Sequence, residues 1–208
     1  FTVELSTGTP GATIIYTTDG TLPAAGNGTV VAAPDANTAP FAMVPINTTT
    51  CLRAIGIKSG FEPTNVDTHT YIFASRVLQQ DGRRLGGVNW GHSGPEWDMD
   101  REVVTHPSAA SRVVASDLMA IPTISLVLPF DDFFGSGGLY ISGESVERNC
   151  SIEYINPEQN PADPNSARGF QVDGTVQIVG GSSTGRWKSN KLSMRLKFSP
   201  DLRHPVFD

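Results

Sequence analysis

The chain has 208 residues, of which 21 are acidic and 15 basic, so its formal charge is −6 and its isoelectric point lies near 5.1. This balance argues against a nucleic-acid-binding protein, which needs a basic face. No apolar run approaches the roughly 18 residues of a membrane-spanning helix, so no membrane span is expected. Many glycines (21) and prolines (15) with few charged residues (17%) predict a mainly β protein of short strands and turns.

Residues 1–73 are predicted to form a first unit made of short strands. The β-branched segment 12–18 ends at the turn pair Asp19-Gly20. Residues 22–39, rich in Ala, Gly, Asn and Pro, are expected to run loosely along one edge. The predicted strands cover residues 2–6, 12–18, 41–46, 49–58 and 68–73. Short strands with turn signals between them indicate a small antiparallel β-sandwich.

This unit contains the motifs T-P-G-A-T-I at 9–14, Y-T-T-D-G-T at 16–21, L-R-A-I-G at 52–56, G-F-E-P at 60–63 and T-Y at 70–71. Together they resemble the chitobiase/β-hexosaminidase C-terminal domain. The resemblance implies an accessory, immunoglobulin-like sandwich without the hexosaminidase catalytic residues. Asp19 is a candidate general acid, although an Asp before Gly more often shapes the turn. Tyr16 and Tyr71 are candidates for stacking on sugar, although alternate strand aromatics more often belong to the core.

Residues 74–120 are predicted to link this unit to a second one and to contain one short helix near 108–120. Ser108 suits the N-cap of that helix, and Pro122 is expected to stop it. Six apolar residues can share one side of such a helix: Ala109, Ala110, Val113, Val114, Leu118 and Met119.

The same linker contains acidic residues that suggest a metal hypothesis. In an extended chain four alternating carboxylates would lie on one side and suit Ca²⁺; they are Glu96, Asp98, Asp100 and Glu102. Arg101 lies among them and the glycine of an EF-hand is missing, so a solvated acidic face is favoured. Residues 100–104 fit either one helical turn or an extended segment. His92 and His106 lack the spacing of a helical zinc pair.

Residues 121–208 are predicted to form a second β-rich (α+β) unit. Residues 121–128 are an apolar run typical of a buried strand, and residues 139–142 and 150–155 also fit strands. Between them lies a loop or single turn with Asp131 and Asp132, for which a helix cap is favoured over acid–base catalysis. Residues 156–167 are expected to be an exposed loop.

The stretch 169–198 is predicted to be a hairpin. Residues 172–179 and 192–198 alternate between apolar and polar side chains, the mark of half-buried strands. The loop between them offers backbone N–H groups and cations that could cradle a phosphate or nucleotide, although a hairpin loop with solvated cations is favoured. The candidate contacts are Gly180, Gly181, Ser182, Ser183, Lys188 and Lys191.

Four motif groups follow one another in order: P-E-W-D-M-D-R-E-V-V at 95–104, I-P-T-I-S-L at 121–126, F-G…G-L-Y…E-R…I-E-Y from 134 to 154, and G-G-S-S…K-L-S-M-R-L-K-F from 180 to 198. They resemble the spore-coat protein H (CotH) kinase-like family, with Arg101 where proline is usual. The resemblance implies that 121–208 is the N-terminal part of an atypical kinase domain that uses ATP and Mg²⁺. Some members transfer phosphate to secreted or coat proteins.

In that family the acidic residues that hold Mg²⁺ lie well downstream of the last motif, and here only ten residues, 199–208, follow it. Lys191 would then be a phosphate-contacting lysine without its catalytic partners. We therefore expect no cofactor in this chain. Phe1 also enters the first predicted strand without a leader, so both ends look cut and a segment of a larger secreted protein is expected.

Two thiols and several functional classes complete the expectations. Cys51 and Cys150 are expected to be free, buried thiols, which is favoured over a long-range disulfide between them. The leading hypothesis is a non-catalytic segment of an extracellular or cell-surface modular protein. The alternatives are a matrix, surface-layer or filament building block, the nucleotide-binding part of a secreted kinase, and a carbohydrate-binding accessory module. Expected partners are other modules of the parent polypeptide, copies of the chain and other extracellular proteins.

Overall fold

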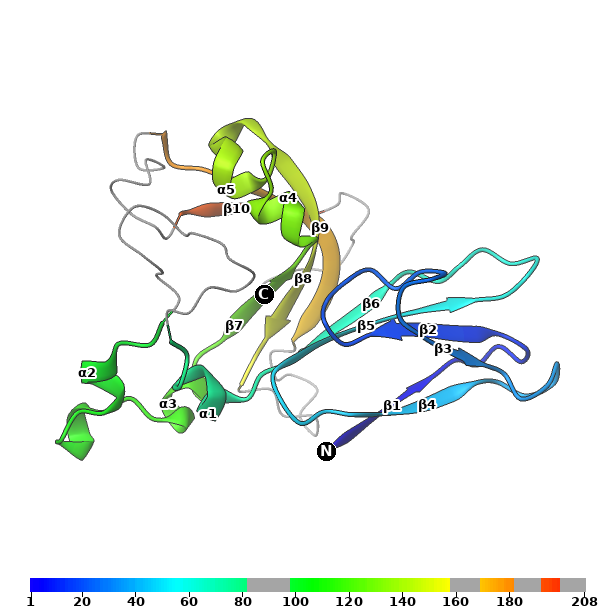
Figure 1. Ribbon diagram of the computed structural model, residues 1–208, viewed down its shortest axis with the longest axis horizontal. Helices are drawn as coiled ribbons and strands as arrows, with labels where there is room; N and C mark the ends of the chain where they lie inside the picture. The colour runs from blue at the N-terminus through cyan, green and yellow to red at the C-terminus, as the bar shows by residue number, and fades with distance from the viewer. Residues whose placement is uncertain (82–97, 158–168, 182–191, 199–208) are drawn as a thin grey trace. The chain divides into compact units, whose positions relative to one another are not determined.

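A computed structural model describes residues 1–81, 98–157, 169–181 and 192–198 (Figure 1). The protein is mainly β, with three antiparallel sheets and short helices, as the composition predicts. The chain divides into two compact units, Phe1–Phe73 (unit 1) and Ala74–Asp208 (unit 2). In the described part of the chain, no helix has the length and apolar character needed to cross a membrane.

Unit 1 is a sandwich of two antiparallel sheets. A two-stranded sheet pairs β1 (Thr2–Ser6) with β4 (Phe41–Pro45). A four-stranded sheet has the order β3-β2-β5-β6; its strands are β2 (Thr13–Thr17), β3 (Thr29–Ala32), β5 (Thr50–Ile57) and β6 (Asp67–Tyr71). The five predicted strands are present. Part of the segment 22–39, which was expected to be loose, forms β3 instead. This prediction is wrong because the short β-branched run of β3 gains stability by pairing with β2.

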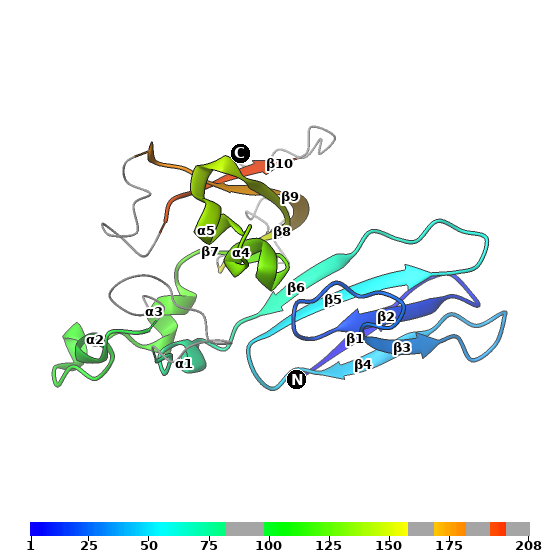
Figure 2. The same ribbon diagram turned by 45° about the horizontal axis from the view of Figure 1, so that its top comes forward.

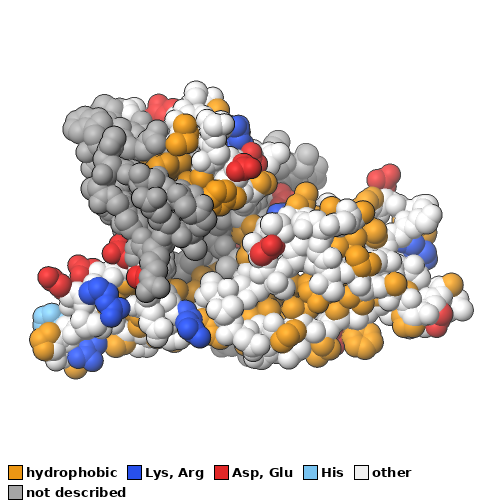
Figure 3. Space-filling model, viewed as in Figure 1, with side chains coloured by type: hydrophobic (Ala, Val, Ile, Leu, Met, Phe, Trp, Pro, Cys, Tyr) orange, Lys and Arg blue, Asp and Glu red, His pale blue; other side chains and the backbone are white. Residues whose placement is uncertain are grey.

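The core of unit 1 lies between the two sheets. Val44, Ile46 and Leu52 are buried there, and Tyr16 and Tyr71 pack against them. Both tyrosines therefore belong to the core, as the favoured interpretation predicted. On the outer surface Phe41 and Met43 of β4 stay more than half exposed, and Figure 3 shows hydrophobic side chains gathered over β1 and β4.

The other face of the four-stranded sheet buries a polar group. Arg53 is only 7% exposed and Thr68 is fully buried. The guanidinium of Arg53 donates hydrogen bonds to Thr68 Oγ1 (3.2 Å) and to the carbonyl oxygen of Gly20 (3.4 Å). These bonds satisfy a buried cation and fix the loop that begins at Asp19 against the sheet.

Unit 2 is built on one antiparallel sheet with the order β10-β9-β8-β7 (Figure 2). Its strands are β7 (Thr123–Val127), β8 (Glu147–Ile155), β9 (Phe170–Ile178) and β10 (Met194–Phe198). The predicted hairpin is confirmed, since β9 pairs with β10 from Ile178↔Met194 to Gly174↔Phe198. Strands predicted over 121–128 and 150–155 are also present.

Period-two alternation gives this sheet one apolar face. Cys150, Ile152, Val176 and Ile178 are buried on it together with Leu139 from the preceding helix. Both cysteines are free; Cys150 is buried, as predicted, whereas Cys51 is only half-buried. Burial, and to a smaller extent the charge of Asp173, raise the pKa of the Cys150 thiol to about 11.

The helices in the described part of unit 2 are all short, and they differ from the prediction of one short helix. They are α1 (Ala74–Val77), α2 (Arg101–Val104), α3 (Ala115–Met119), α4 (Phe130–Phe134) and α5 (Leu139–Ser142), with the 3₁₀ turns η1 (Ala109–Ser111) and η2 (Gly143–Ser145).

The short helix predicted near 108–120 is found only in part, as α3, and the residues before it form η1. η1 and α3 are separate, because Arg112 and Val114 have extended backbone between them. The carboxylate of Asp117 accepts the Val114 N–H at 2.8 Å and so starts α3 anew. The predicted common apolar side is not buried, since Val114 is 41% and Met119 59% exposed.

The strand predicted over 139–142 is also wrong, because these residues form α5. The turn before it is tight: a Cβ at Gly138 would lie 2.7 Å from the carbonyl oxygen of Asp131. From this turn the helix buries Leu139 and Tyr140, and Leu139 enters the core of the sheet. Tertiary packing thus overrides the strand propensity of a short apolar run.

Candidate functional site

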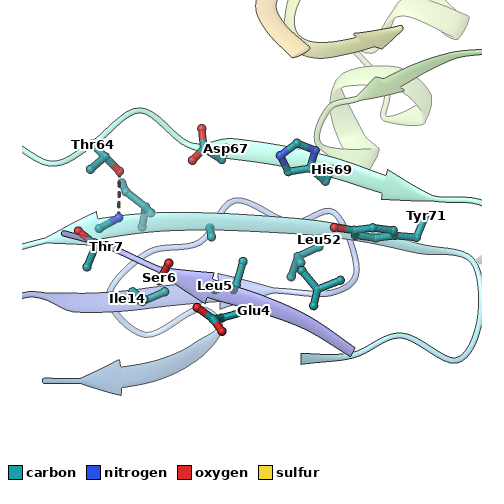
Figure 4. A pocket seen from close by; sticks show the side chains of 14 residues that line it. Glu4, Leu5, Ser6, Thr7, Ile14, Leu52, Thr64, Asp67, His69 and Tyr71 are labelled. Carbon is teal, nitrogen blue, oxygen red and sulfur yellow. Dashed lines mark hydrogen bonds between the residues drawn. The ribbon is translucent and has the colours of Figure 1, made fainter. Parts of the chain in front are cut away.

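Unit 1 has an open groove of about 460 Å³ between β1 and the last two strands of the larger sheet (Figure 4). Its lining combines apolar floor residues with polar residues at the rim. The lining residues are Val3, Glu4, Leu5, Ser6, Thr7, Ile14, Leu52, Ala54, Ile55, Gly56, Thr64, Asp67, His69 and Tyr71.

The groove exists because a two-stranded sheet covers a four-stranded one. Leu52 pairs with His69 and Ala54 with Asp67, so these four side chains share the inner face of the larger sheet. Asp67 and His69 are nevertheless exposed, whereas Thr68, on the other face, is fully buried. The small sheet therefore ends before it covers β6.

The edge of β1 borders this uncovered strip. Four β1 residues, Val3 to Ser6, and the next residue, Thr7, line the groove, and no β4 residue does. Phe1 and Ile46 exchange two backbone hydrogen bonds, of 2.9 and 3.4 Å. Because hydrogen-bonded pairs alternate in an antiparallel ladder, the backbone N–H and C=O groups of Glu4 and Ser6 point away from β4, toward the groove.

The register supports this assignment of the ladder. Pro45 lies opposite Thr2, at a position where its missing N–H costs no bond to β1. Within the described residues β1 pairs with β4 alone. The groove thus presents a row of backbone donors and acceptors, an apolar floor around Leu52 and Ile14, and carboxylates from two strands, Glu4 and Asp67 (Figure 4).

A known family model matches most of this unit. Residues 1–68 match the family model of the chitobiase/β-hexosaminidase C-terminal domain. The match spans β1 to β5 and the first residues of β6, and it agrees with the resemblance that the motifs at 9–63 indicate. A search of curated proteins and a search of solved structures found no significant match.

In this sandwich Asp19 shapes a turn. Its carboxylate accepts the backbone N–H (3.0 Å) and the hydroxyl (2.6 Å) of Thr21. The Thr21 hydroxyl bond, followed by the Thr21 N–H bond, lowers the pKa of Asp19. A carboxylate held ionised in this way suits a turn and is a poor proton donor, so the turn interpretation describes Asp19.

The predicted calcium cluster is only partly within the described residues. Glu96 and His92 lie outside them, and among the described residues no three His, Cys, Asp or Glu side chains converge on one point. Asp100 instead accepts the N–H of Glu102 at 2.8 Å as the N-cap of α2. Residues 101–104 therefore form the helical turn, the alternative to the extended segment that would align the carboxylates.

The predicted anion cradle is also described in part. Gly180 and Gly181 lie within the structure, whereas Ser182, Ser183, Lys188 and Lys191 lie outside the described residues. The N–H of Gly181 donates to the carboxylate of Glu144, and Gln177 binds the backbone oxygen of Glu144 at 3.0 Å. A negative side chain thus already accepts one of these N–H groups, and the nucleotide contact stays a prediction.

Two further acidic residues tie unit 2 together. Asp132 in α4 pairs with Arg148 of β8 at 3.2 Å, and Arg148 also binds the backbone oxygen of Gly137. Glu147 binds the Lys197 ammonium and the Thr175 hydroxyl across three strands. These contacts, that to Lys197 first, lower the pKa of the Glu147 carboxyl.

The groove was not predicted from the sequence. A weak signal was present in β6, where Asp67 and His69 occupy the alternate positions that continue to the core residue Tyr71. Polar side chains at inward positions mark a part of a sheet that no second layer covers.

Proposed function

We propose that these 208 residues are a non-catalytic, structural segment of a larger secreted or cell-surface modular protein. The family match supports an accessory β module of the kind associated with carbohydrate-active enzymes. In the proposal unit 2 is the leading part of a CotH-like kinase domain. That part rests on its four sequence motifs, since the family match ends at residue 68.

The observation that carries the proposal is the use of the acidic side chains. General acids, general bases and metal ligands must present oxygen atoms to a substrate or ion. Here six described carboxylates, three of which the sequence offers as candidates (Asp19, Asp100 and Asp132), hold turns, helix starts and strands of their own unit. They are Asp19, Asp100, Asp117, Asp132, Glu144 and Glu147.

A phosphotransfer assay tests the non-catalytic role. The full chain is incubated with ATP and Mg²⁺, and release of ADP is followed beside the variant Lys191→Met. We expect both proteins to match the buffer blank. Turnover by the parent chain that Lys191→Met abolishes would overturn the proposal, and stoichiometric ATP binding without turnover would replace it with the nucleotide-binding alternative.

Two binding assays separate the structural role from the remaining alternatives. We expect the chain to stay in solution when mixed with chitin or cellulose, and retention on either polymer would favour a carbohydrate-binding module. Electron micrographs of the concentrated chain that show ordered sheets or fibres without ATP would favour a surface-layer or filament building block.

A further inference from the structure

We propose that the groove of unit 1 takes an extended, cationic peptide segment, which adds to the free edge of β1 as a third strand. The inference rests on the proposed structural role and names the surface and the partner chemistry through which that role operates. The sandwich is short of one strand, and the groove is the place of that strand.

The backbone geometry carries the first step. The N–H and C=O groups of Glu4 and Ser6 face the groove, with Thr2 in the same phase at the start of β1. A peptide in β conformation beside β1 would pair with these groups, which is the mode of recognition known as strand addition. The stretch that lines the groove, 3–7, begins with four residues of β1 and ends at Thr7, so with a rise of about 3.3 Å per residue the bound segment spans about five residues.

The walls define which side chains fit. Alternate side chains of an added strand would point onto the inner face of β5 and β6, where Leu52 is buried and Ala54 is small and half-buried. An apolar side chain suits that end of the groove. Asp67 lies on the same inner face, directly opposite Ala54.

Charge selects the peptide. Asp67 is exposed on the β6 wall and Glu4 is exposed on β1, so both faces of the added strand would meet a carboxylate. The structure shows no ion pair for either carboxylate among the described residues. A Lys or Arg whose side chain points onto the inner face complements Asp67, one on the outer face complements Glu4, and an acidic segment is repelled.

A direct test uses the full chain labelled with ¹⁵N and the peptide acetyl-Thr-Val-Thr-Lys-Thr-Val-Thr-amide. Binding is followed by fluorescence anisotropy and by hydrogen exchange of single amides. We expect saturable binding, with slower exchange at the amides of Glu4 and Ser6. The amides of Val3 and Leu5 already bond to β4 and serve as internal controls, because their exchange should change little.

Two pairs of variants sharpen the test. Ser6→Pro removes one groove-facing N–H at the end of β1, and we expect about three- to tenfold weaker binding. Phe41→Pro, at the register partner of Ser6, changes only the opposite edge of the sheet and should leave the affinity unchanged. Asp67→Lys should weaken binding of the lysine peptide by about threefold to tenfold and strengthen binding of the same peptide with Glu in place of Lys.

The outcomes are distinct. Binding without protection of Glu4 and Ser6 would overturn strand addition, as would an affinity that Ser6→Pro and Phe41→Pro lower equally. No binding at about 1 mM peptide, or protection of the groove by chito-oligosaccharides instead of peptide, would overturn the peptide partner. Turnover of ATP by the chain would overturn the proposed function and leave the strand-addition result intact.

Discussion

The two units bury their sheets in different ways. In unit 1 a sheet covers a sheet, and the covering sheet has only two strands, so the inner face of β6 stays open at Asp67 and His69. In unit 2 short helices cover one face of a four-stranded sheet, where Leu139 packs on Ile152 and Val176. Unit 1 therefore exposes part of the inner face of its larger sheet. In unit 2 the helices cover the apolar face, so that face does not need a further strand.

The polar residues of the two sheets express the same difference. The second face of the unit 2 sheet holds Thr175, Glu147 and Lys197, which bind one another. Polar residues that satisfy each other's hydrogen bonds and charges do not need a partner molecule to do so. In the groove of unit 1, Glu4 and Asp67 have no such tie within the described residues, and this is the surface to which we assign the added strand.

The strongest test of two separate cores is a pair of truncations. Leu52→Ala in unit 1 and Ile152→Ala in unit 2 each remove a side chain that is at most 2% exposed, which should cost about 3 kcal/mol in the unit concerned. Hydrogen exchange should accelerate in β2 and β5 for the first variant and in β8 and β9 for the second. Ile124→Ala, at a site 52% exposed, is the control and should change stability by less than about 0.5 kcal/mol. Equal acceleration in both units would contradict separate cores.

Cys150 reports opening of unit 2. Burial raises its pKa to about 11 from an ordinary value near 9, so its thiolate fraction at neutral pH falls about a hundredfold. Iodoacetamide should label this residue slowly in the folded chain and rapidly in denaturant, as followed by mass spectrometry. Ile152→Ala should raise the rate and Leu52→Ala should not. Rapid labelling of Cys150 in the folded parent chain would contradict its burial.

A smaller effect is expected where β9 and β10 approach closely. A Cβ at Gly174 would lie 2.5 Å from the backbone oxygen of Lys197 and 2.9 Å from Ile152 Cδ1. Gly174→Ala should therefore destabilise unit 2 by about 1–3 kcal/mol through overpacking, measured by urea unfolding. The matched control is Gly137→Ala, whose Cβ would meet its nearest atom at 3.9 Å. Equal effects of the two alanines would argue against close packing at Gly174.

The smallest effect is electrostatic and appears in acid. The pKa of Glu147 is lowered in the folded state, mainly by Lys197, so its contribution to stability is present above its ordinary pKa near 4.5. That contribution is lost as the pH falls through the lower folded-state value. Glu147→Gln should flatten the acid side of the stability profile of unit 2, and salt should reduce the difference because the group is exposed. An unchanged profile would show that the contact adds nothing to stability.

The sequence predicted the elements with strong alternation. β9 and β10 follow from residues such as Val176, Ile178 and Leu196, whose spacing fixes one apolar face. The sequence-based prediction failed where tertiary packing determines the secondary structure. Leu139 and Tyr140 were predicted to lie in a strand, but after the tight turn at Gly138 they form a helix that covers the sheet. β3 was not predicted for a related reason, because its four residues become a strand only beside β2.

The candidate site depends even more on long-range pairing. Whether Asp67 faces solvent is set by the number of strands that residues 2–6 and 41–45 contribute to the opposing sheet, and no local pattern encodes that number. The acidic residues were easier to interpret, because Asp before Gly in Asp19-Gly20 has a local physical meaning. The lysines at 188 and 191 remain predictions outside the described residues.

Pro45 makes the two edges of the β1-β4 sheet different from each other. Its nitrogen lies on the edge of β4 that faces away from β1, and it cannot donate there. One margin of the β1-β4 sheet is thus open and the other is impaired. Addition of a further strand is therefore disfavoured at the β4 margin of this sheet, and growth of the sheet is directed to the β1 margin.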